Sequence, residues 1–359
     1  MAKSSILADL HETLQAPMHE EIAVTIGPKL TERKDILVAL KNVEEEIDKQ
    51  FKTKFSLMRM GDKVGVPIPS IPTRMVSLDK LLIQCGGIPR GRIVEFFGPE
   101  SGGKTTTALQ IIAEEQKTGA FCAFVDAEHA LDPNWCNTLG VNVEDLIIAQ
   151  PDSGEQALET VIALVRSRAV SLIVVDSVSA LTPQAELDGD MGDSHMGLQA
   201  RMMSQACRKL RGICNQTGVT VIFINQIREK IGVMFGSPET TGGGRALKHY
   251  ASVRIDIRKI GAIKEADEVI GNRVRFKIVK NKVGSPFREA EIDLLYGYGL
   301  NIYGDWLDVA ADRGVIAKAG SWYSFGADRI GQGRISAYTF LKTNPDVFSK
   351  VQEALDKVL

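Results

Sequence analysis

The segment Gly98-Pro-Glu-Ser-Gly-Gly-Lys104-Thr105 constrains the fold of this chain more than any other feature. It fits the pattern G-x-x-x-x-G-K-S/T and lies directly between an apolar stretch, residues 93–97, and a helical pattern that begins at Lys104. Glycines let backbone N–H groups curl around a phosphate, and the N-terminus of the following helix adds a positive dipole. This strand-to-helix context favours a phosphate-binding loop over a flexible glycine turn.

The chain around this loop alternates apolar strands with helices, which is typical of a parallel sheet covered by helices on both faces. From residue 253 the apolar period changes to two, which predicts hairpin-joined strands that extend the sheet in antiparallel fashion. The sequence therefore predicts an α/β fold with a mostly parallel, twisted sheet. The predicted parallel strands are 93–97, 121–125, 146–149, 172–175 and 219–224, with helices from Lys104, after Pro133 and from Glu155.

Two segments outside this core have patterns of their own. Residues 31–55 place apolar side chains at helical spacing, and three prolines in residues 66–72 separate this amphipathic helix from the core. After about residue 300 the pattern becomes mixed, as expected for a small α/β lobe. We divide the chain into an N-terminal extension with no assigned role (1–30), an N-terminal helix or strand segment (31–65), the core (66–300) and a C-terminal small domain (301–359).

Composition excludes several classes of protein. With 44% hydrophobic and 25% charged residues, the 359-residue chain is neither disordered nor of low complexity. Its longest apolar run, residues 120–125, is far shorter than the roughly 20 residues of a membrane span. The N-terminus does not resemble a secretory signal, so we expect a cytoplasmic protein. The five cysteines form no CxxC pair, which indicates neither a disulfide framework nor a zinc site, and Cys122 and Cys214 are expected in the core.

Charge is distributed unevenly along the chain. The formal net charge is only -2, but residues 245–288 contain twelve Lys and Arg against four Asp and Glu. Such a segment can attract phosphate groups of a nucleic acid. Its alternative interpretation is a solvated face of a strand.

Candidate metal ligands accompany the phosphate loop. A phosphate loop needs an acid at the end of another strand to help hold Mg²⁺, and Asp176 follows the apolar residues 172–175. Thr105 is the second candidate ligand, and Lys104 is placed to reach the phosphates. Without the phosphate loop, Asp176 would be equally well explained as a helix cap.

Two further strand ends carry candidate catalytic groups. Asp126 and Glu128 follow one strand and are expected to share a face, with Glu128 reaching further into the site as a candidate general base. Asn225 and Gln226 end another strand, where Gln226 can sense a γ-phosphate. The alternative for these groups is solvation of loops.

Two glycine-rich loops are candidates for binding a polynucleotide. The loop at residues 227–244 contains five glycines and starts beside Gln226, so nucleotide state could order or release it. The earlier loop, residues 185–196, precedes a helix on which Arg201 and Arg208 share one face. Basic groups beside loops that carry Met196 and Phe235 suit a site that follows a nucleic-acid backbone. Alternatively, Met196 and Phe235 are buried anchors and the arginines are merely solvated.

Taken together, these motifs resemble the RecA recombinases of bacteria, and a host-cell or a phage-encoded member would look alike. The resemblance runs from about residue 33 to the end of the chain and is highly specific. It is carried by residues 98–106, 126–133, 174–177, 192–197, 201–205, 225–228 and 232–236, and by Lys280-Asn-Lys282.

The resemblance implies a RecA-type P-loop ATPase core and a DNA-dependent ATPase that uses ATP and Mg²⁺. Such a protein forms ATP-dependent filaments on single-stranded DNA, pairs that strand with duplex DNA and exchanges strands in homologous recombination and DNA repair. It further implies self-association into a helical filament, with residues 31–65 packing on the adjacent subunit. A repressor of the SOS response to DNA damage and accessory recombination proteins are the further partners it implies, and no membrane is involved.

The resemblance also assigns residues to roles. The catalytic set it implies is Glu128, Lys104, Gln226, Lys280 and Lys282, with the last two reaching the γ-phosphate bound by a neighbouring subunit. The ATP-binding set is Gly98, Pro99, Glu100, Ser101, Gly102, Gly103, Lys104, Thr105, Thr106, Asp132, Trp135 and Tyr296, and the metal ligands are Thr105 and Asp176. The DNA-binding set is Met196, Gly197, Arg201, Ser204, Arg208, Arg228, Phe235, Gly243, Gly244 and Arg245.

The chain departs from the family's usual pattern in four places. Trp135 replaces a usual tyrosine, so stacking should survive while a hydroxyl contact is lost. Gly102 replaces a usual serine, which we expect to leave the backbone unchanged. Residues 1–30 extend beyond the family's usual start, and the acidic C-terminal tail is missing, so inhibition of duplex binding by such a tail is not expected.

Two other functions compete with a DNA-dependent ATPase. One is a ring-shaped helicase or a small-molecule kinase, but a kinase should supply a lid of clustered arginines, whereas these loops offer mostly glycine and apolar tips. The other is a non-catalytic, ATP-gated interaction protein, in which Glu128 or Lys104 would be expected to be absent. Both residues are present.

Overall fold

The computed structural model describes residues 33–52, 67–190, 193, 195, 197–229, 239–265 and 267–359. The chain divides into two compact units, Met1–Val66 and Pro67–Leu359. In the first unit, residues Arg33–Phe51 form helix α2, as the apolar spacing predicted. The described residues of this unit, 33–52, form α2 and contain no second element that could cover its apolar side chains.

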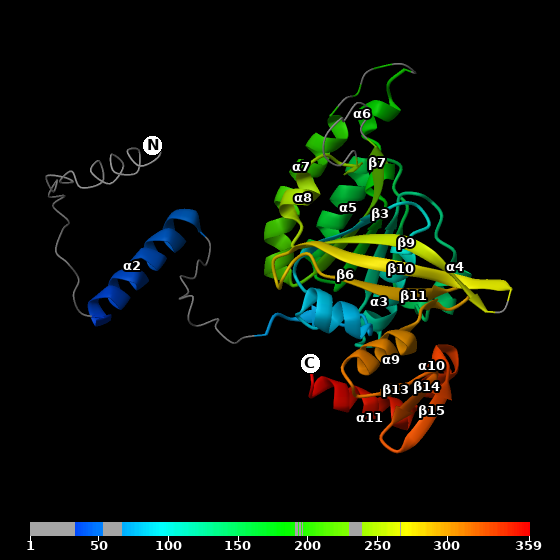
Figure 1. Cartoon of the computed structure of the whole chain (residues 1–359). Helices are drawn as coiled ribbons and strands as arrows, with labels where there is room; N and C mark the ends of the chain where they lie inside the picture. Colours follow the sequence, from blue (N-terminus) through cyan, green and yellow to red (C-terminus); the bar gives the residue numbers. More distant parts are fainter. Residues whose placement is uncertain are drawn as a thin grey trace, which may run out of the picture. The chain divides into compact units, whose positions relative to one another are not determined.

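A ten-stranded sheet organises the second unit, in the order β12-β11-β10-β9-β3-β7-β6-β4-β5, with β8 paired to β7 (Figure 1). Strands β9, β3, β7, β6, β4 and β5 are mutually parallel, whereas β10, β11, β12 and β8 are antiparallel to their neighbours. The strands are β3 (Ile93–Gly98), β4 (Cys122–Asp126), β5 (Leu146–Ala149), β6 (Leu172–Asp176), β7 (Thr220–Glu229), β8 (Glu239–Thr241), β9 (Val253–Glu265), β10 (Glu268–Asn281), β11 (Glu289–Leu295) and β12 (Gly299–Leu300).

One strand departs from the predicted direction. The sequence pattern predicted that every strand from residue 253 onward would extend the sheet in antiparallel fashion, but β9 runs parallel to β3, with Val94 opposite Val253 and Phe97 opposite Asp256. The reason is the connection between β8 and β9. The short helix α8 (Ala246–Tyr250) returns the chain to the amino-terminal ends of the parallel strands, so β9 runs in the same direction as β3. The antiparallel extension begins one strand later, at β10.

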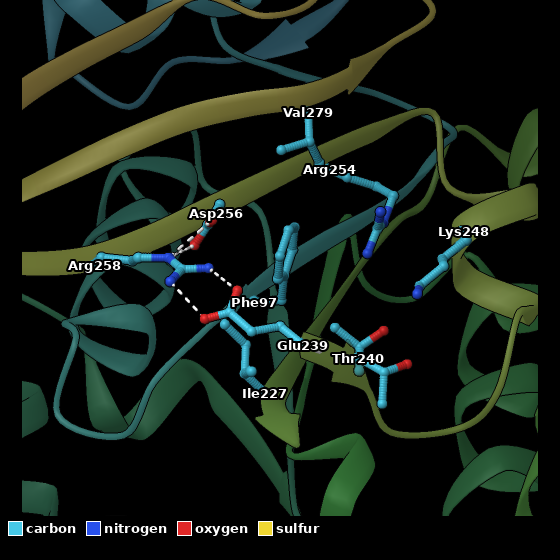
Figure 2. A pocket seen from close by; sticks show the side chains of 10 residues that line it. Phe97, Ile227, Glu239, Thr240, Lys248, Arg254, Asp256, Arg258 and Val279 are labelled. Atoms are coloured by element: carbon cyan, nitrogen blue, oxygen red, sulfur yellow. Dashed lines mark hydrogen bonds and ion pairs between the residues drawn. The ribbon is translucent and has the colours of Figure 1, made fainter. Parts of the chain in front are cut away.

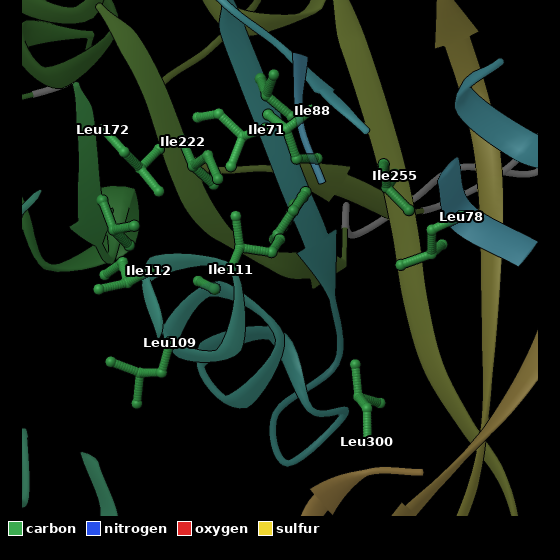
Figure 3. Packing of buried hydrophobic residues seen from close by; sticks show 14 of the residues in the cluster. Ile71, Leu78, Ile88, Leu109, Ile111, Ile112, Leu172, Ile222, Ile255 and Leu300 are labelled. Carbon is green, nitrogen blue, oxygen red and sulfur yellow. The ribbon is translucent and has the colours of Figure 1, made fainter. Parts of the chain in front are cut away.

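Helices cover both faces of the sheet, and each face has its own hydrophobic core. Helix α3 (Lys104–Gln116) packs Leu109, Ile111 and Ile112 against strand residues such as Ile222 (Figure 3). Helices α5 (Gly154–Ser167) and α7 (Leu198–Thr217) pack on the opposite face. Neighbouring residues of one strand alternate between the two cores, so that Val174 faces α3 and Val175 faces α5 and α7. Cys122 and Cys214 are fully buried, as predicted.

A small lobe follows the sheet and has a third core of its own. Its three-stranded antiparallel sheet lies beside three helices, and Trp306 and Phe348 meet at its centre with ring centroids 5.8 Å apart. The elements are α9 (Ile302–Asp312), β13 (Ala317–Ala319), β14 (Trp322–Phe325), β15 (Asp328–Gln332), α10 (Arg334–Thr343) and α11 (Pro345–Asp356).

A short segment ahead of β3 attaches this lobe to the sheet. It contains β1 (Ser70–Ile71), the π-helix η2 (Ser77–Ile83) and β2 (Ile88–Pro89). The backbone N–H and hydroxyl of Ser77 both donate to the Asp305 carboxylate on α9, and Trp306 Nε1 donates to the Arg74 carbonyl at 2.8 Å. No described helix is long and apolar enough to cross a bilayer.

Candidate functional site at the carboxyl ends of the parallel strands

The phosphate loop occupies the turn from β3 into α3, and its glycines are required by crowding. A side chain on Gly98 would place its Cβ 2.0 Å from the Ile257 carbonyl oxygen of β9. Gly103, the N-cap of α3, has a φ of 92°, a left-handed conformation that favours glycine. The loop therefore keeps a backbone path that presents its N–H groups at the start of α3, where an anion is stabilised.

The structure around Gly102 differs from what the family resemblance predicted. The expectation that glycine in place of serine leaves the backbone unchanged is wrong, because a Cβ at Gly102 would lie 2.9 Å from the Ile257 carbonyl oxygen and 3.2 Å from that of Pro99. A serine here requires the loop or β9 to shift. The glycine therefore lets β9 approach the phosphate loop more closely than a side chain would permit.

Lys104 is the first residue of α3, and its side chain is buried. Its Nζ donates to the carbonyl oxygens of Pro99 at 2.6 Å and Gly98 at 3.2 Å. Burial lowers the pKa of this ammonium from its ordinary value, while nearby carboxylates, chiefly Asp176, act in the opposite direction. A cation held by two neutral carbonyl groups in a partly desolvated place is well suited to pair with an anion.

Thr105 and Asp176 meet where a metal ion would be needed. Thr105 Oγ1 donates to Asp176 Oδ2 at 2.5 Å, and Asp176 lies at the end of β6, next to β4 and β7. Burial raises the pKa of Asp176 to about 6, although the hydrogen bond from Thr105 acts against that rise. Mg²⁺ prefers oxygen ligands and usually takes one or two from the protein and the rest from phosphates and water, so this pair fits it. Among the described residues no group of three or more His, Cys, Asp or Glu side chains could hold a metal ion alone.

Glu128 is connected to two neighbouring strands. Its Oε1 accepts a hydrogen bond from the Ser177 hydroxyl after β6 and another, at 3.2 Å, from Gln226 Nε2 on β7. Glu128 is exposed and therefore accessible to water and substrate. The three side chains form a bridge across the ends of β4, β6 and β7.

Asp126 does not join Glu128 as the strand pattern predicted. It is buried, and its carboxylate accepts hydrogen bonds at 3.2 Å from the backbone N–H groups of Ala130 and Leu131 and from Gln150 Nε2. Because β4 ends at Asp126, the alternation of side chains that would have placed both acids on one face stops there. Asp126 instead shapes the turn that carries Glu128.

The residues expected around the base of a nucleotide are less completely assembled. Asp132 caps the short helix α4 (Pro133–Thr138) by accepting from the Asn134 N–H at 2.9 Å, and Trp135 is partly buried against the core. Tyr296 is 55% exposed, and Asn272 donates to its hydroxyl at 3.1 Å. Tyr296 follows β11, whose Leu294 would lie 2.6 Å from a Cβ on Gly103, so Tyr296 shares the edge of the sheet with the phosphate loop. The remaining loop residues Pro99, Glu100 and Ser101 are exposed, and Thr106 is half-buried in α3.

Lys280 and Lys282 lie toward the other end of the strands. Lys280 is opposite Arg254 and the Lys282 N–H donates to the Ser252 carbonyl, whereas the phosphate loop touches Ile257, about 16 Å further along β9 than residue 252. Lys280 Nζ donates to the carbonyls of Lys248 at 2.6 Å and His249 at 2.9 Å. Burial, with Lys282 next in effect, lowers the pKa of Lys280 to about 8. The fold does not bring these two lysines to the phosphate loop of their own chain.

The residues predicted to contact DNA lie around the two loops, on the described side of each. Gly197 is the N-cap of α7, and Arg201 and Arg208 are exposed on that helix with Ser204 between them. Arg228 on β7 is exposed, and its Nη2 donates to the Ser179 carbonyl at 3.5 Å. The segment 227–244, predicted as a loop, begins and ends as a strand pair, because residues 227–229 of β7 pair with residues 239–241 of β8. Gly243 and Gly244 end this segment and the exposed Arg245 follows it, whereas Met196 and Phe235 lie outside the described residues.

A charged pocket of about 220 Å³ adjoins the phosphate-loop strand (Figure 2). The Arg254 guanidinium lies 4.6 Å from the centroid of the Phe97 ring and donates to Glu95, while Arg258 bridges Asp256 at 2.8 Å and Glu239 at 2.6 Å. These ion pairs neutralise part of the charge of the basic segment 245–288. Sequence reasoning did not identify Glu95 or Ser177 as part of the site, and only Ser177, beside Asp176, had a neighbour that could have indicated it.

Comparison with known proteins covers most of the chain. A family model described as the RecA N-terminal domain matches residues 38–301, and one described as the RecA C-terminal domain matches residues 304–359. The chain is 57% identical over 318 residues to Protein RecA of Citrifermentans bemidjiense, covering 88% of this chain and 94% of the relative. It is 58% identical over 313 residues to Protein RecA of Rubrobacter xylanophilus, covering 87% and 90%. A crystal structure of the RadB recombinase, 21% identical, covers 64% of this chain and 98% of that chain with a TM-score of 0.48, a likeness too distant to inform the site.

Proposed function

The chain belongs to the RecA family of recombination proteins, and from this premise we propose that its strand-end site binds and hydrolyses ATP with Mg²⁺ when DNA is bound. DNA recombination and repair are the general activities of the family. In this proposal the protein forms ATP-dependent filaments on single-stranded DNA, pairs that strand with duplex DNA and exchanges strands in the cytoplasm. A repressor of the SOS response and accessory recombination proteins complete the proposed set of partners.

Nucleotide binding in this proposal begins with a change of partners at the loop. Lys104 exchanges the carbonyl oxygens of Gly98 and Pro99 for phosphate oxygens, which gives the ammonium a charged partner in a buried place. Thr105 and Asp176 would hold Mg²⁺, which supplies neutralisation of phosphate charge when bound. Asp132, Trp135 and Tyr296 are proposed to contact the base, with the Trp135 ring replacing the family's usual tyrosine.

Glu128 is proposed to act as the general base that orients and deprotonates the attacking water. Both of its hydrogen bonds, from a hydroxyl and an amide, are accepted by Oε1, so the carboxylate keeps acceptor capacity for a water. Gln226 forms one of these hydrogen bonds and stands on β7, the strand that leads into the second loop. A γ-phosphate that draws Gln226 toward itself would change the start of that loop, which connects nucleotide state to DNA affinity.

Lys280 and Lys282 are proposed to reach the γ-phosphate of a neighbouring subunit, so that hydrolysis occurs at the interface. Their position toward the start of β9 supports this, because they cannot serve the phosphate loop of their own chain. A filament also requires a second contact between subunits. The edge strand β5 exposes Ile147 and Ile148, at 42% and 49%, and an apolar strand edge of this kind suits the segment 31–65 of an adjacent subunit.

The single observation that carries this proposal is the chain of contacts from Thr105 to Asp176, and from Ser177 through Glu128 to Gln226. It joins the phosphate loop to the strand that enters the second loop. Measuring ATP hydrolysis with and without single-stranded DNA tests it, and stimulation by DNA is the expected result. Phosphate transfer to a small molecule without DNA would favour a kinase, and absence of turnover would favour a non-catalytic, ATP-gated protein.

A further inference from the structure

The ends of the two loops meet at one place, which we call the loop junction. It consists of the turn at residues 178–181 after β6, the first turn of α7, and Gly242–Gly244. The turn directly follows Ser177, the residue that donates to Glu128. The loop junction is therefore next to the nucleotide site in sequence and holds the described end of each loop.

One side chain connects all three parts of the loop junction. Gln199 Nε2 donates to the carbonyl oxygens of Val178 at 2.9 Å and Leu181 at 3.1 Å. Gln199 Oε1 accepts from the Gly243 N–H at 3.1 Å. The amide thus donates two hydrogen bonds to the turn and accepts one from the second loop. A side chain of the same size needs both a donor and an acceptor at its end to make these contacts, which glutamate and methionine lack.

The glycines of the loop junction are closely packed against their neighbours. Gly243 and Gly244 have φ values of +71° and +72°. A Cβ on Gly243 would lie 3.0 Å from Met203 Cγ and 3.0 Å from Val178 Cγ1, and a Cβ on Gly244 would lie 2.7 Å from Ala200 Cβ. The backbone of the second loop is therefore in direct contact with α7 and with the turn, so a shift of either is felt by the other.

The side-chain amide of Asn225, on β7, holds the same glycine segment from the sheet. Asn225 Oδ1 accepts from the Gly242 N–H at 3.2 Å, and its Nδ2 donates to the Gly242 carbonyl at 3.1 Å and to Glu95 Oε1 at 2.9 Å. Glu95 is fully buried and also accepts from Arg254. This contact fixes Gly242 to the sheet, whereas Gln199 is the contact that ties Gly243 to the turn and to α7.

We propose that Gln199 is a positioning residue that makes the two DNA-binding loops respond together to the nucleotide. This inference rests on the proposed function of the loops. Gln226 connects the nucleotide site to the start of the second loop, and Gln199 connects it to the end of that loop through Ser177 and the turn. Gln199 also lies in the first turn of α7, directly after the first loop, so its hydrogen bonds connect the end of the first loop to the turn and to the second loop.

The test replaces Gln199 by glutamate, which has the same shape but cannot donate to Val178 and Leu181 when ionised. A second variant, Gln199→Met, keeps the volume without any hydrogen bond, and Gln216→Glu, at an exposed position of the same helix, is the matched control. For each protein, affinity for a single-stranded oligonucleotide is measured by fluorescence anisotropy with a non-hydrolysable ATP analogue and with ADP. Hydrolysis of ATP without DNA and the melting temperature are measured in parallel.

We expect both Gln199 variants to reduce the ratio of the two DNA affinities by about fivefold or more, with DNA-independent hydrolysis and the control unchanged. An unchanged ratio in a folded Gln199 variant overturns the proposal. A parallel fall of DNA-independent hydrolysis also overturns it, because Gln199 would then only support the fold; if glutamate prevents folding, the methionine variant decides. Failure of the proposed function is distinguishable, since the unmodified protein would then show no difference between the two nucleotides.

Discussion

The carboxylates of the strand-end site and those at the joint with the C-terminal lobe have different kinds of partner. At the joint, Asp293 is buried and accepts from Arg273 Nη1 at 2.6 Å and from Arg334, which also donates to Asp308 at 2.7 Å. At the strand ends, Asp176 and Glu128 accept from hydroxyl and amide groups instead. Asp293 and Asp308 of the joint thus have charged partners, whereas Asp176 and Glu128 have neutral hydrogen-bond partners.

We infer that this difference separates acids that support the fold from acids that serve the proposed site. A buried carboxylate paired with an arginine loses much by giving up its partner, because an uncompensated charge remains in the interior. A carboxylate held by a hydroxyl or an amide loses about one ordinary hydrogen bond when a metal ion or a water replaces that partner. Changes at the two places are therefore expected to affect different measurements.

The largest effect is expected for Lys104→Ala. It removes the main point charge available to the phosphates, so affinity for ATP should fall on the order of 1,000-fold, with little change in the free energy of unfolding. Isothermal titration calorimetry measures the affinity, and Lys117→Ala, at the exposed end of the same helix, is the control. Unchanged ATP affinity would remove Lys104 from the site.

Glu128→Gln should act on turnover alone. The amide keeps the shape of the side chain but cannot accept a proton, so hydrolysis should slow by about 100-fold or more while ATP binding persists. Steady-state hydrolysis with saturating DNA measures this, compared with Glu144→Gln at an exposed position. Full turnover in the Glu128 variant would contradict the assignment of the general base.

Arg334→Met should show the opposite behaviour. It leaves Asp293 with one arginine and Asp308 without its closest one, so the free energy of unfolding should fall by about 2 kcal/mol. Denaturant unfolding measures the loss, and Arg313→Met, at the exposed end of α9, is the control. A change of ATP affinity without a change of stability would refute the division between the two regions.

The joint should also give stability a pH dependence. Burial raises the pKa of Asp305 to about 6 from its ordinary 3.8, with Asp308 as a like-charged neighbour. The folded state then binds the proton more tightly than the unfolded chain does, so this contribution to stability is present at low pH and is lost as pH rises through about 6. Between about pH 4.5 and about pH 7.5 the unmodified protein should lose about 2 kcal/mol relative to Asp305→Asn.

Denaturant unfolding across that pH range checks this prediction. Asp312→Asn, at the exposed end of the same helix, should follow the unmodified protein. A parallel pH profile for the Asp305→Asn variant would show that Asp305 does not titrate in this interval.

The sequence predicted what depends on neighbouring residues. The phosphate loop, the strands that lead to Asp176 and Gln226, and the exposed arginines of α7 all follow from local periodicity and turn chemistry, and the structure contains them. Features that depend on contacts between residues far apart in the sequence were not predicted. The direction of β9 follows from the return of the chain through α8, and the crowding of Gly102 comes from the carbonyl of Ile257 on another strand.

Gln199 gave no sequence signal for a related reason. An amide in the first turn of a helix is ordinary, and its importance lies in the carbonyls of Val178 and Leu181 and the N–H of Gly243, which only the fold brings within reach. Lys280 and Lys282 could be recognised by resemblance, but only the register of β9 and β10 shows that they lie far from their own phosphate loop.

In the proposed function, a triphosphate at the strand ends sets the state of the loops that hold single-stranded DNA. The most direct test of this dependence is the affinity of the unmodified protein for one labelled oligonucleotide with a non-hydrolysable ATP analogue, with ADP and without nucleotide. We expect tight binding with the analogue and clearly weaker binding in the other two conditions. Equal affinity in all three would contradict it.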